Sequence, residues 1–188
     1  MIPQFLKRLQ EFSPLSEATQ AELQQYLSVV EIPKGEFILK HHEVCRYIFY
    51  IEKGFARQYY FRDGKEITEW FAGTHEFCFS ISSYFDATPS NLLIEAVEES
   101  TVIRLHRDGI LQLSKTNPEI AQLALGMFAR SLKFSQLRTE SILFQSARDR
   151  YLHLLETKPY VIQKVSLAHI ASFLGISQET LSRIRAKI

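Results

Sequence analysis

The sequence predicts an α+β protein with an N-terminal antiparallel β-roll, a long helix and a C-terminal helix-turn-helix. Three observations predict it. Residues 37–102 carry short runs of aromatic and β-branched residues between glycine turns, residues 119–144 keep a helical period without proline, and residues 167–188 form two short amphipathic segments joined at Gly175. We therefore expect three parts: a roll over 1–116, a helix over 117–145 and a helical tail over 146–188.

The first thirty residues favour short helices. The apolar spacing from Phe5 to Val30 suits two amphipathic helices, and Ser16 is a suitable N-cap for the second. After Gly35 the pattern changes to β. The turn signals Lys53-Gly54 and Asp63-Gly64 separate runs such as "YIFYIEKG" and "ARQYYF". Many short strands at this spacing indicate a closed roll or barrel rather than an open sheet.

Composition and charge narrow the class of protein. The 188 residues are 46% hydrophobic and 23% charged, which is typical of a globular chain and excludes general disorder. Residues 1–145 hold 15 Lys or Arg against 18 Asp or Glu, whereas residues 146–188 hold 7 against 3. The tail is therefore basic by itself, which favours a polyanionic partner.

The amino terminus and the cysteines indicate a cytoplasmic protein. "MIPQFLKRLQEF" is amphipathic and lacks the apolar run and cleavage site of a signal peptide. No stretch approaches the roughly 18 apolar residues of a membrane span, so no membrane partner is expected. Two cysteines, Cys45 and Cys78, supply neither a disulfide framework nor the thiolates of an iron–sulfur cluster, and no cofactor is predicted.

The long helix is expected to join two subunits. At 1.5 Å per residue it would be roughly 40 Å long, longer than a small domain needs. Part of its apolar stripe should pack against the roll, and the remainder against the same helix of a second copy, which would make a homodimer. The alternative is a helix that only crosses its own domain. The stripe consists of Ile120, Leu123, Met127, Phe134, Leu137 and Phe144.

The tail has the pattern of a helix-turn-helix. "ARDRYLHLLET" predicts a helix, "YVIQKV" a short strand, and residues 167–188 two further helices. Two steeply crossing helices need a small residue where they touch and a residue with positive φ in the turn, and Ala171 and Gly175 meet these needs in order. Ser177 is placed to cap the second helix.

The polar face of the last helix is predicted to enter the major groove of double-stranded DNA. Arg can bind guanine through two hydrogen bonds and Glu can accept from cytosine. The alternative is a solvated face on which Glu179 and Arg183, four residues apart, form a weak ion pair. Base contacts are assigned to Gln178, Glu179, Ser182 and Arg183, and phosphate contacts to Ser177, Thr180, Arg185 and Lys187.

With these motifs in place, the chain resembles the Crp/Fnr family of bacterial transcription regulators over nearly its whole length. "IASFLGISQETLSRIR" carries most of the resemblance, with "PKGEFIL", "YIFYIEKGFARQYY" and "DGKEI" in the roll. The resemblance implies a cyclic-nucleotide-binding-like β-roll, a dimerisation helix and a winged helix-turn-helix. It also implies base contacts at Gln178, Glu179 and Arg183, a phosphate contact at Thr180, and no catalytic activity. A small-molecule effector and RNA polymerase are further partners that such a regulator would have.

The effector pocket departs from the family pattern. Members that bind cyclic AMP carry a Gly-Glu pair and then an Arg-Ser pair, and an ungapped comparison places Phe79 and Ser80 at the first pair and Ser90 and Asn91 at the second. The cationic partner of the phosphate is then missing, at a cost of about 1.5–3 kcal/mol for each charge-assisted hydrogen bond. We expect no cyclic AMP response.

Other sensor chemistries are weaker alternatives. No cysteine precedes Cys45, unlike the iron–sulfur members of the family, and His75 with Cys78 offers only a faint haem site because residues three apart in a strand face opposite ways. A metal on His41, His42 and Glu43, as in a cupin-like metalloenzyme, meets the same objection.

Two interpretations of the roll stay open. The aromatic residues Phe71, Phe77, Phe79, Tyr84 and Phe85 could line an apolar pocket, although core packing is the simpler expectation. The whole chain could also be a ligand-binding β-roll whose helical tail serves protein contacts rather than DNA.

Overall fold

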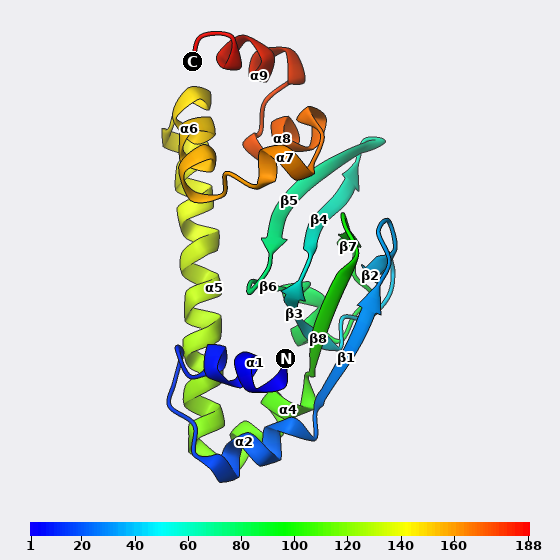
Figure 1. The fold of residues 1–188 in the computed structure, drawn as a ribbon, viewed down its shortest axis with the longest axis vertical. Helices are drawn as coiled ribbons and strands as arrows, with labels where there is room; N and C mark the ends of the chain where they lie inside the picture. The colour runs from blue at the N-terminus through cyan, green and yellow to red at the C-terminus, as the bar shows by residue number, and fades with distance from the viewer.

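The computed structural model describes residues 1–188 (Figure 1). A β-roll lies beside one long helix, and short helices gather at the far end of that helix (Figure 1). The helices are α1 (Ile2–Leu9), α2 (Glu17–Gln24), α3 (Ile81–Asp86), α4 (Asp108–Leu111), the 3₁₀ turn η1 (Leu113–Lys115), α5 (Pro118–Phe144), α6 (Ala147–Thr157), α7 (Val161–Lys164), α8 (Leu167–Leu174) and α9 (Gln178–Arg185). No helix is both long and apolar enough to cross a membrane.

The roll consists of two four-stranded antiparallel sheets, which confirms the predicted β-roll. One sheet has the order β1-β8-β3-β6 and the other β2-β7-β4-β5. The strands are β1 (Leu27–Ile32), β2 (Phe37–Leu39), β3 (Tyr47–Lys53), β4 (Phe55–Arg62), β5 (Lys65–Gly73), β6 (Phe77–Cys78), β7 (Leu93–Ala96) and β8 (Ser100–His106). Strand β1 begins inside the region predicted to be helical, which ended at Val30. Its residues form a strand there because they pair with β8 along its length.

Glycine makes the tight connection between β3 and β4. Gly54 has φ +113°, and a Cβ atom there would lie 2.2 Å from the Oγ of Ser100. Only glycine fits both the backbone angle and the close approach of β8. The two sheets therefore meet closely at this corner.

The β4–β5 hairpin contains a β-bulge that sets the orientation of its side chains. Gln58 pairs with Trp70 but Tyr59 pairs with Thr68, so Glu69 is the extra residue of β5. Strand side chains normally alternate between faces. The extra residue interrupts that alternation, so the neighbours Glu69 and Trp70 both line the cavity described below.

The main core lies between the two sheets and the helices that close them. Phe5 and Leu9 of α1, Leu23 of α2 and Ile120 of α5 are all at most 1% exposed within it. Ser16 caps α2 by accepting from the Thr19 amide at 3.3 Å, as predicted. The N-terminal helices therefore cover the roll and hold the start of α5.

Helix α5 forms as predicted and begins at a capped proline turn. The side chain of Asn117 accepts from the Glu119 amide at 3.0 Å, and Pro118 occupies the first turn, where no N–H is needed. The helix continues to Phe144 without interruption. Its first half packs on the main core, and its second half runs beside β5, where Phe134 lies 6.0 Å from Trp70 (Figure 1).

The predicted stripe on α5 divides into a part that packs on the roll and a part that stays exposed. Ile120, Leu123 and Met127 are at most 7% exposed and lie in the core of their own subunit, so they are not free to meet a second copy. Phe134 and Leu137 remain exposed at 42% and 59%. A second apolar stripe, which the sequence analysis did not consider, lies on the opposite side of α5. It consists of Leu125, Leu132 and Leu143, which are 65%, 69% and 67% exposed.

Helical geometry separates the two stripes. Leu125 and Leu143 are 18 residues apart, which is about five full turns at 3.6 residues per turn, and Leu132 lies about two turns from Leu125. Leu123 and Leu132 are nine residues apart, about two and a half turns, so they point to opposite sides. The exposed leucines therefore face away from the roll.

The tail differs from the prediction at residues 160–165. The expected strand is the short helix α7, and the described tail contains four helices and no wing strand. Val161 is fully buried in a second core with Val165 packed beside it, and the Val165 amide donates to the Val161 carbonyl at 3.1 Å. A helical turn brings residues four apart to one face, whereas a strand would have sent neighbouring side chains to opposite faces. Tertiary packing thus overrides the β-branched pattern.

Candidate nucleic-acid interface and ligand cavity

Helices α8 and α9 form the predicted helix-turn-helix. Gly175 ends α8 with φ 67°, and the Ile176 amide donates to the Ala171 carbonyl at 3.0 Å. Ser177 caps α9 by accepting from the Thr180 amide at 3.2 Å. Ala171 and Leu181 are buried where the two helices touch. The turn and the cap therefore fix the angle at which α9 leaves α8.

The polar face of α9 is open to solvent. Gln178, Glu179, Ser182 and Arg183, the predicted base-contacting residues, are all exposed, and α9 lies at one end of the molecule (Figure 1). The predicted phosphate contacts Ser177, Arg185 and Lys187 are also exposed, whereas Thr180 is half-buried. The structure thus brings all eight side chains to one helix and its flanks.

Glu179 and Arg183 do not pair with each other. Arg183 Nη2 donates to Thr180 Oγ1 at 3.2 Å, and no ion pair joins the two charged groups. A hydrogen bond from the Ser177 side chain is the largest cause that lowers the pKa of the Glu179 carboxyl, with the Arg183 charge a smaller one. Glu179 is therefore a carboxylate at neutral pH, and both charges remain available to a partner.

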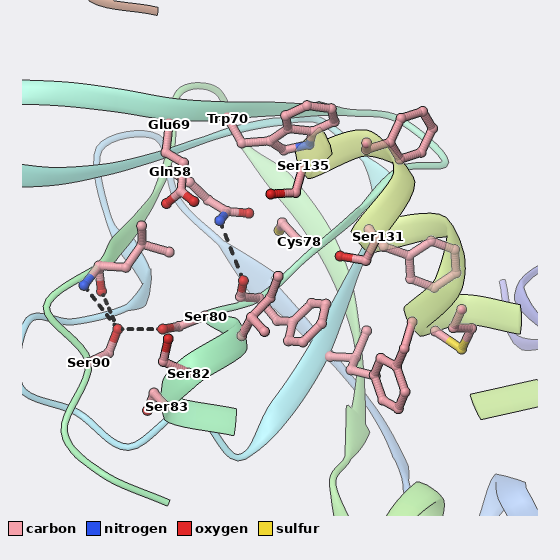
Figure 2. A pocket seen from close by; sticks show the side chains of 18 of the residues that line it. Gln58, Glu69, Trp70, Cys78, Ser80, Ser82, Ser83, Ser90, Ser131 and Ser135 are labelled. Atoms are coloured by element: carbon pink, nitrogen blue, oxygen red, sulfur yellow. Dashed lines mark hydrogen bonds between the residues drawn. The ribbon is translucent and has the colours of Figure 1, made fainter. Parts of the chain in front are cut away.

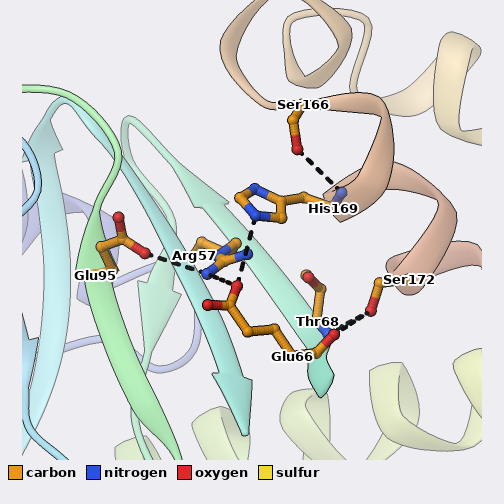
Figure 3. A network of polar contacts seen from close by, with 7 residues as sticks. All are labelled: Arg57, Glu66, Thr68, Glu95, Ser166, His169 and Ser172. Carbon is orange, nitrogen blue, oxygen red and sulfur yellow. Dashed lines mark hydrogen bonds and ion pairs between the residues drawn. The ribbon is translucent and has the colours of Figure 1, made fainter. Parts of the chain in front are cut away.

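The C-terminal tail is seated on the edge strand of the roll. Ser172 Oγ accepts from the Thr68 amide at 2.9 Å and donates to the Glu66 carbonyl at 3.0 Å (Figure 3). These backbone groups lie on β5, the last strand of its sheet, where they would otherwise lack a partner. Phe55 and Phe71 of the hairpin share the second core with the tail residue Ile170. The hairpin and the tail are therefore one packed unit.

A buried charge network stands beside this contact. Arg57 is 2% exposed and donates to Glu66 at 2.7 Å and to Glu95 at 3.2 Å, and Figure 3 shows His169 of α8 above the same Glu66 carboxylate. His169 Nε2 lies 3.6 Å from Glu66 Oε2. Desolvation and the Arg57 charge lower the pKa of His169, against the opposing effect of Glu66. The neutral imidazole is therefore favoured in this position.

A cavity of about 620 Å³ lies between the hairpin, the β6–β7 segment and α5. The four predicted effector residues Phe79, Ser80, Ser90 and Asn91 all line it. Figure 2 shows Ser80 and Ser90 at one end, and Trp70 of β5 near Ser131 and Ser135 of α5 at the other. Its volume suits a small organic ligand.

The serine end of the cavity is uncharged. Ser90 Oγ donates to Ser80 Oγ at 2.9 Å and accepts from the Leu92 amide at 3.0 Å (Figure 2). The Gln58 amide donates to the Phe79 carbonyl at 3.5 Å. Residues 77–92 contain no Lys or Arg. Hydroxyl groups therefore occupy the place where a phosphate would need a cation.

The opposite end of the cavity holds residues that the sequence interpretation did not single out. Trp70, Arg138 and Lys158 line it, and Lys158 belongs to the tail. Lys158 Nζ lies 4.4 Å from the Trp70 ring and donates to Glu76 at 2.7 Å and to the Phe71 carbonyl at 2.9 Å. Only the three-dimensional fold joins positions 70 and 158, so spacing in the sequence gave no signal.

The residues considered for a haem or metal site lie apart from one another or contact other groups. Cys78 is buried and burial raises the pKa of its thiol, while His75 is exposed and bonds the Tyr50 hydroxyl at 2.9 Å. His41 and His42 stack on each other in a turn, with ring centroids 3.8 Å apart. No group of three or more His, Cys, Asp or Glu side chains is arranged to hold a metal ion.

The aromatic set divides between cores and cavity. Phe71 belongs to the second core, Tyr84 is fully buried in the main core, and Phe85 is 42% exposed against Phe128. Phe77 and Phe79 line the cavity while packing on the main core. The set therefore serves both of the purposes considered for it.

Comparison with known proteins agrees with this architecture. Residues 29–117 match the family described as the cyclic nucleotide-binding domain. The chain is 26% identical to the cyclic AMP receptor protein of Thermus thermophilus over 157 residues, which cover 81% of this chain and 72% of that protein.

Solved structures share the fold. FixK2 from Bradyrhizobium japonicum has a TM-score of 0.72 and 20% identity, covering 86% of this chain and 83% of its own. A protein from Eubacterium rectale, titled as a transcriptional regulator of the Crp/Fnr family, has a TM-score of 0.70 and 20% identity, covering 90% and 82%. At these identities the structures support the shared fold alone.

Proposed function

We propose that this chain, which belongs to the Crp/Fnr family of transcription regulators, binds specific DNA sequences as a homodimer. The comparisons support the resemblance noted in the sequence at the level of the family, whose members regulate transcription and are not enzymes. The operator, the dimer and the ligand response of this chain are the parts that we propose.

One observation carries the DNA-binding proposal: the polar face of α9 is exposed and its charges are unpaired. Glu179 and Arg183 point away from the second core, because each is two residues from Leu181, which is fully buried in it. Gln178 is exposed in the first turn of the same helix. Arg183 can bind a guanine edge and Glu179 a cytosine amino group. The Ser177 cap and Arg185 would meet phosphate on either side.

The leucine face of α5 supports the proposal of a dimer. Leu125, Leu132 and Leu143 lie on one side of the helix and are each about two-thirds exposed. Exposed apolar stripes of this kind mark contact surfaces. Two copies that meet along this face would present two α9 helices to one duplex, about 34 Å apart on successive major grooves.

We further propose that cyclic AMP does not regulate this chain. The serine pair Ser80 and Ser90 offers neutral hydroxyls where the phosphate needs a cation, and the cations that line the cavity, such as Arg138, lie on other elements. A phosphate placed at the serine end would lose its water without gaining a charge-assisted bond. Calorimetric titration with cyclic AMP is expected to show no binding, and DNA affinity should not change when it is added.

The experiment that tests DNA recognition compares two substitutions. A bound sequence is first selected from a random DNA pool. Arg183→Ala should cost about 1–3 kcal/mol per half-site at one base position and relax specificity there, because it removes a base-edge contact. Lys187→Ala should weaken binding to cognate and random DNA alike, because it removes a phosphate contact. Fluorescence anisotropy at several salt concentrations measures both.

Lys115→Ala provides a matched control. Lys115 is exposed and comes just before α5, whose start lies at the opposite end of the molecule from α9 (Figure 1). Its replacement should leave both affinities unchanged. Equal losses for Arg183→Ala on cognate and random DNA would refute the base-reading assignment. A chain that selects no sequence at all would favour the second candidate, a ligand-binding roll whose tail contacts other proteins.

A further inference from the structure

The cavity has one cation with no carboxylate partner at its tryptophan end. Arg8 pairs with Glu11 and Lys158 pairs with Glu76. Arg138 of α5 forms no ion pair, and its Nη2 donates only to two backbone carbonyls, those of Phe173 at 2.8 Å and Thr68 at 3.5 Å. Its other two guanidinium nitrogens have no partner in the protein. They are donors that a ligand could satisfy.

Arg130 is the remaining cation of the lining, and it is placed differently. It is exposed and lies over the rings of Phe12 and Phe134 at 5.3 and 5.4 Å. Desolvation lowers the pKa of Arg138, with the Glu69 charge opposing that effect. An anion would compensate this loss of water at Arg138 more than at Arg130, which remains solvated.

Aromatic side chains surround the space next to Arg138. Trp70 and Phe134 have ring centroids 6.0 Å apart, and both line the cavity. Ser131 and Ser135 of α5 add hydroxyl groups with no side-chain partner in the protein, and Figure 2 shows them on the same side as Trp70. A flat ring system packed on Trp70 and Phe134 would lie in the same cavity as these hydroxyls and Arg138.

Arg138 also touches the tail. Its guanidinium carbon lies 4.1 Å from the Phe173 ring, and its bond to the Phe173 carbonyl is made in the last turn of α8. Phe173 in turn packs on Phe71 of β5 at 5.1 Å. One side chain therefore belongs both to the cavity lining and to the seat of the helix-turn-helix.

We propose that the cavity binds an aromatic acid, whose ring packs on Trp70 and Phe134 and whose anionic group pairs with Arg138. The same guanidinium holds the Phe173 carbonyl through Nη2, so an anion that draws it toward the cavity through its two free nitrogens loosens the seat of α8 on the roll. The binding step stands on the cavity alone, whereas its effect on operator affinity rests on the function proposed above.

Glu69 provides a second test of the proposal, because its negative charge would repel an anionic ligand. Its carboxylate lines the same cavity, and partial desolvation raises its pKa while Arg138 lowers it. An anionic ligand must overcome the repulsion of this group. Glu69→Gln should therefore strengthen the binding of an anion and leave an uncharged analogue unaffected.

Two dyes with the same ring system test the charge preference. 1-Anilinonaphthalene-8-sulfonate carries a sulfonate, and N-phenyl-1-naphthylamine lacks it. Trp70 is the only tryptophan, so energy transfer from it reports dye binding, and the response of the charge preference to Arg138→Met assigns the dye to this cavity. The sulfonate dye is expected to bind at least tenfold more tightly, and Arg138→Met should reduce that preference to less than threefold. Equal affinities in the unaltered protein, or a preference that survives Arg138→Met, would overturn the proposal.

Two further variants keep the test decisive if Arg138→Met disturbs folding. Glu69→Gln should raise the affinity for the sulfonate dye several-fold, and an unchanged or lower affinity would contradict the proposal. Ser172→Ala weakens the seat of α8 without touching the cavity, so it should preserve the dye preference. Loss of the preference in this variant would show that the seat, rather than the Arg138 charge, sets it.

The effect on the tail has its own measurement. Hydrogen exchange in residues 172–175 should accelerate when the sulfonate dye binds, and should already be fast without dye in Arg138→Met. Unchanged exchange on dye binding would overturn the loosening of the α8 seat while leaving the ligand class intact. None of these measurements involves DNA, so their failure is distinguishable from a failure of DNA recognition.

Cyclic AMP is tested separately with the same protein. Its binding would contradict only the earlier proposal about that nucleotide.

Discussion

Leu132→Ala should dissociate the proposed dimer without unfolding the subunit. Leu132 is 69% exposed, and burying a whole leucine side chain contributes about 1.5–3 kcal/mol. Two-thirds of that is roughly 1–2 kcal/mol per side chain, and two-fold symmetry doubles it to about 2–4 kcal/mol per dimer. At 1.4 kcal/mol per tenfold change, the dimer dissociation constant should rise roughly 30- to 700-fold.

Sedimentation velocity over a range of concentrations measures this shift, and thermal melting of the subunit should change little. Leu137→Ala is the matched control. Leu137 is 59% exposed on the same helix, but it belongs to the stripe that continues from the core-facing residues. A dimer broken by Leu137→Ala and unaffected by Leu132→Ala would refute the assignment of the opposite face.

Three further outcomes follow from the tail. Folding lowers the pKa of His169, so below about pH 6.5 the unfolded chain binds more protons than the folded one. The free energy of unfolding should therefore fall from pH 7.5 to 5.5. His169→Gln should flatten that dependence in thermal melts. Leu181→Ala removes a fully buried side chain, and urea unfolding should show a loss of about 2–5 kcal/mol. Ser177→Ala removes the α9 cap and should make local opening of α9 easier by about 1 kcal/mol, measured by hydrogen exchange.

Local chemistry made much of the fold predictable. The turn at Gly175, the Ser16 and Ser177 caps and the extent of α5 depend on backbone angles and nearby donors, so each leaves a signal within a few residues. The face of α9 was predictable for the same reason, since Leu181 marks its buried side.

Long-range packing was less accessible. Residues 160–165 look like a strand because β-branched residues suit one, and only the second core around Val161 selects a helix. The apolar residues of α5 form two stripes, and the sequence alone does not say which of them the roll covers. The cavity joins Trp70, Arg138 and Lys158 from three separate parts of the chain, so no spacing rule connects them.

The bulge at Glu69 makes the length of β5 more critical than the chemistry of that position. The Thr68 amide before it bonds Ser172 of the tail, and the Phe71 side chain after it packs in the second core, so residues on both sides of the bulge hold the tail. Removing one residue there would reverse the side-chain alternation on one side of the bulge, and would either turn Phe71 away from the second core or move the Thr68 amide out of reach of Ser172. Replacement at 69 should thus be tolerated, whereas a one-residue deletion should detach the tail from the roll.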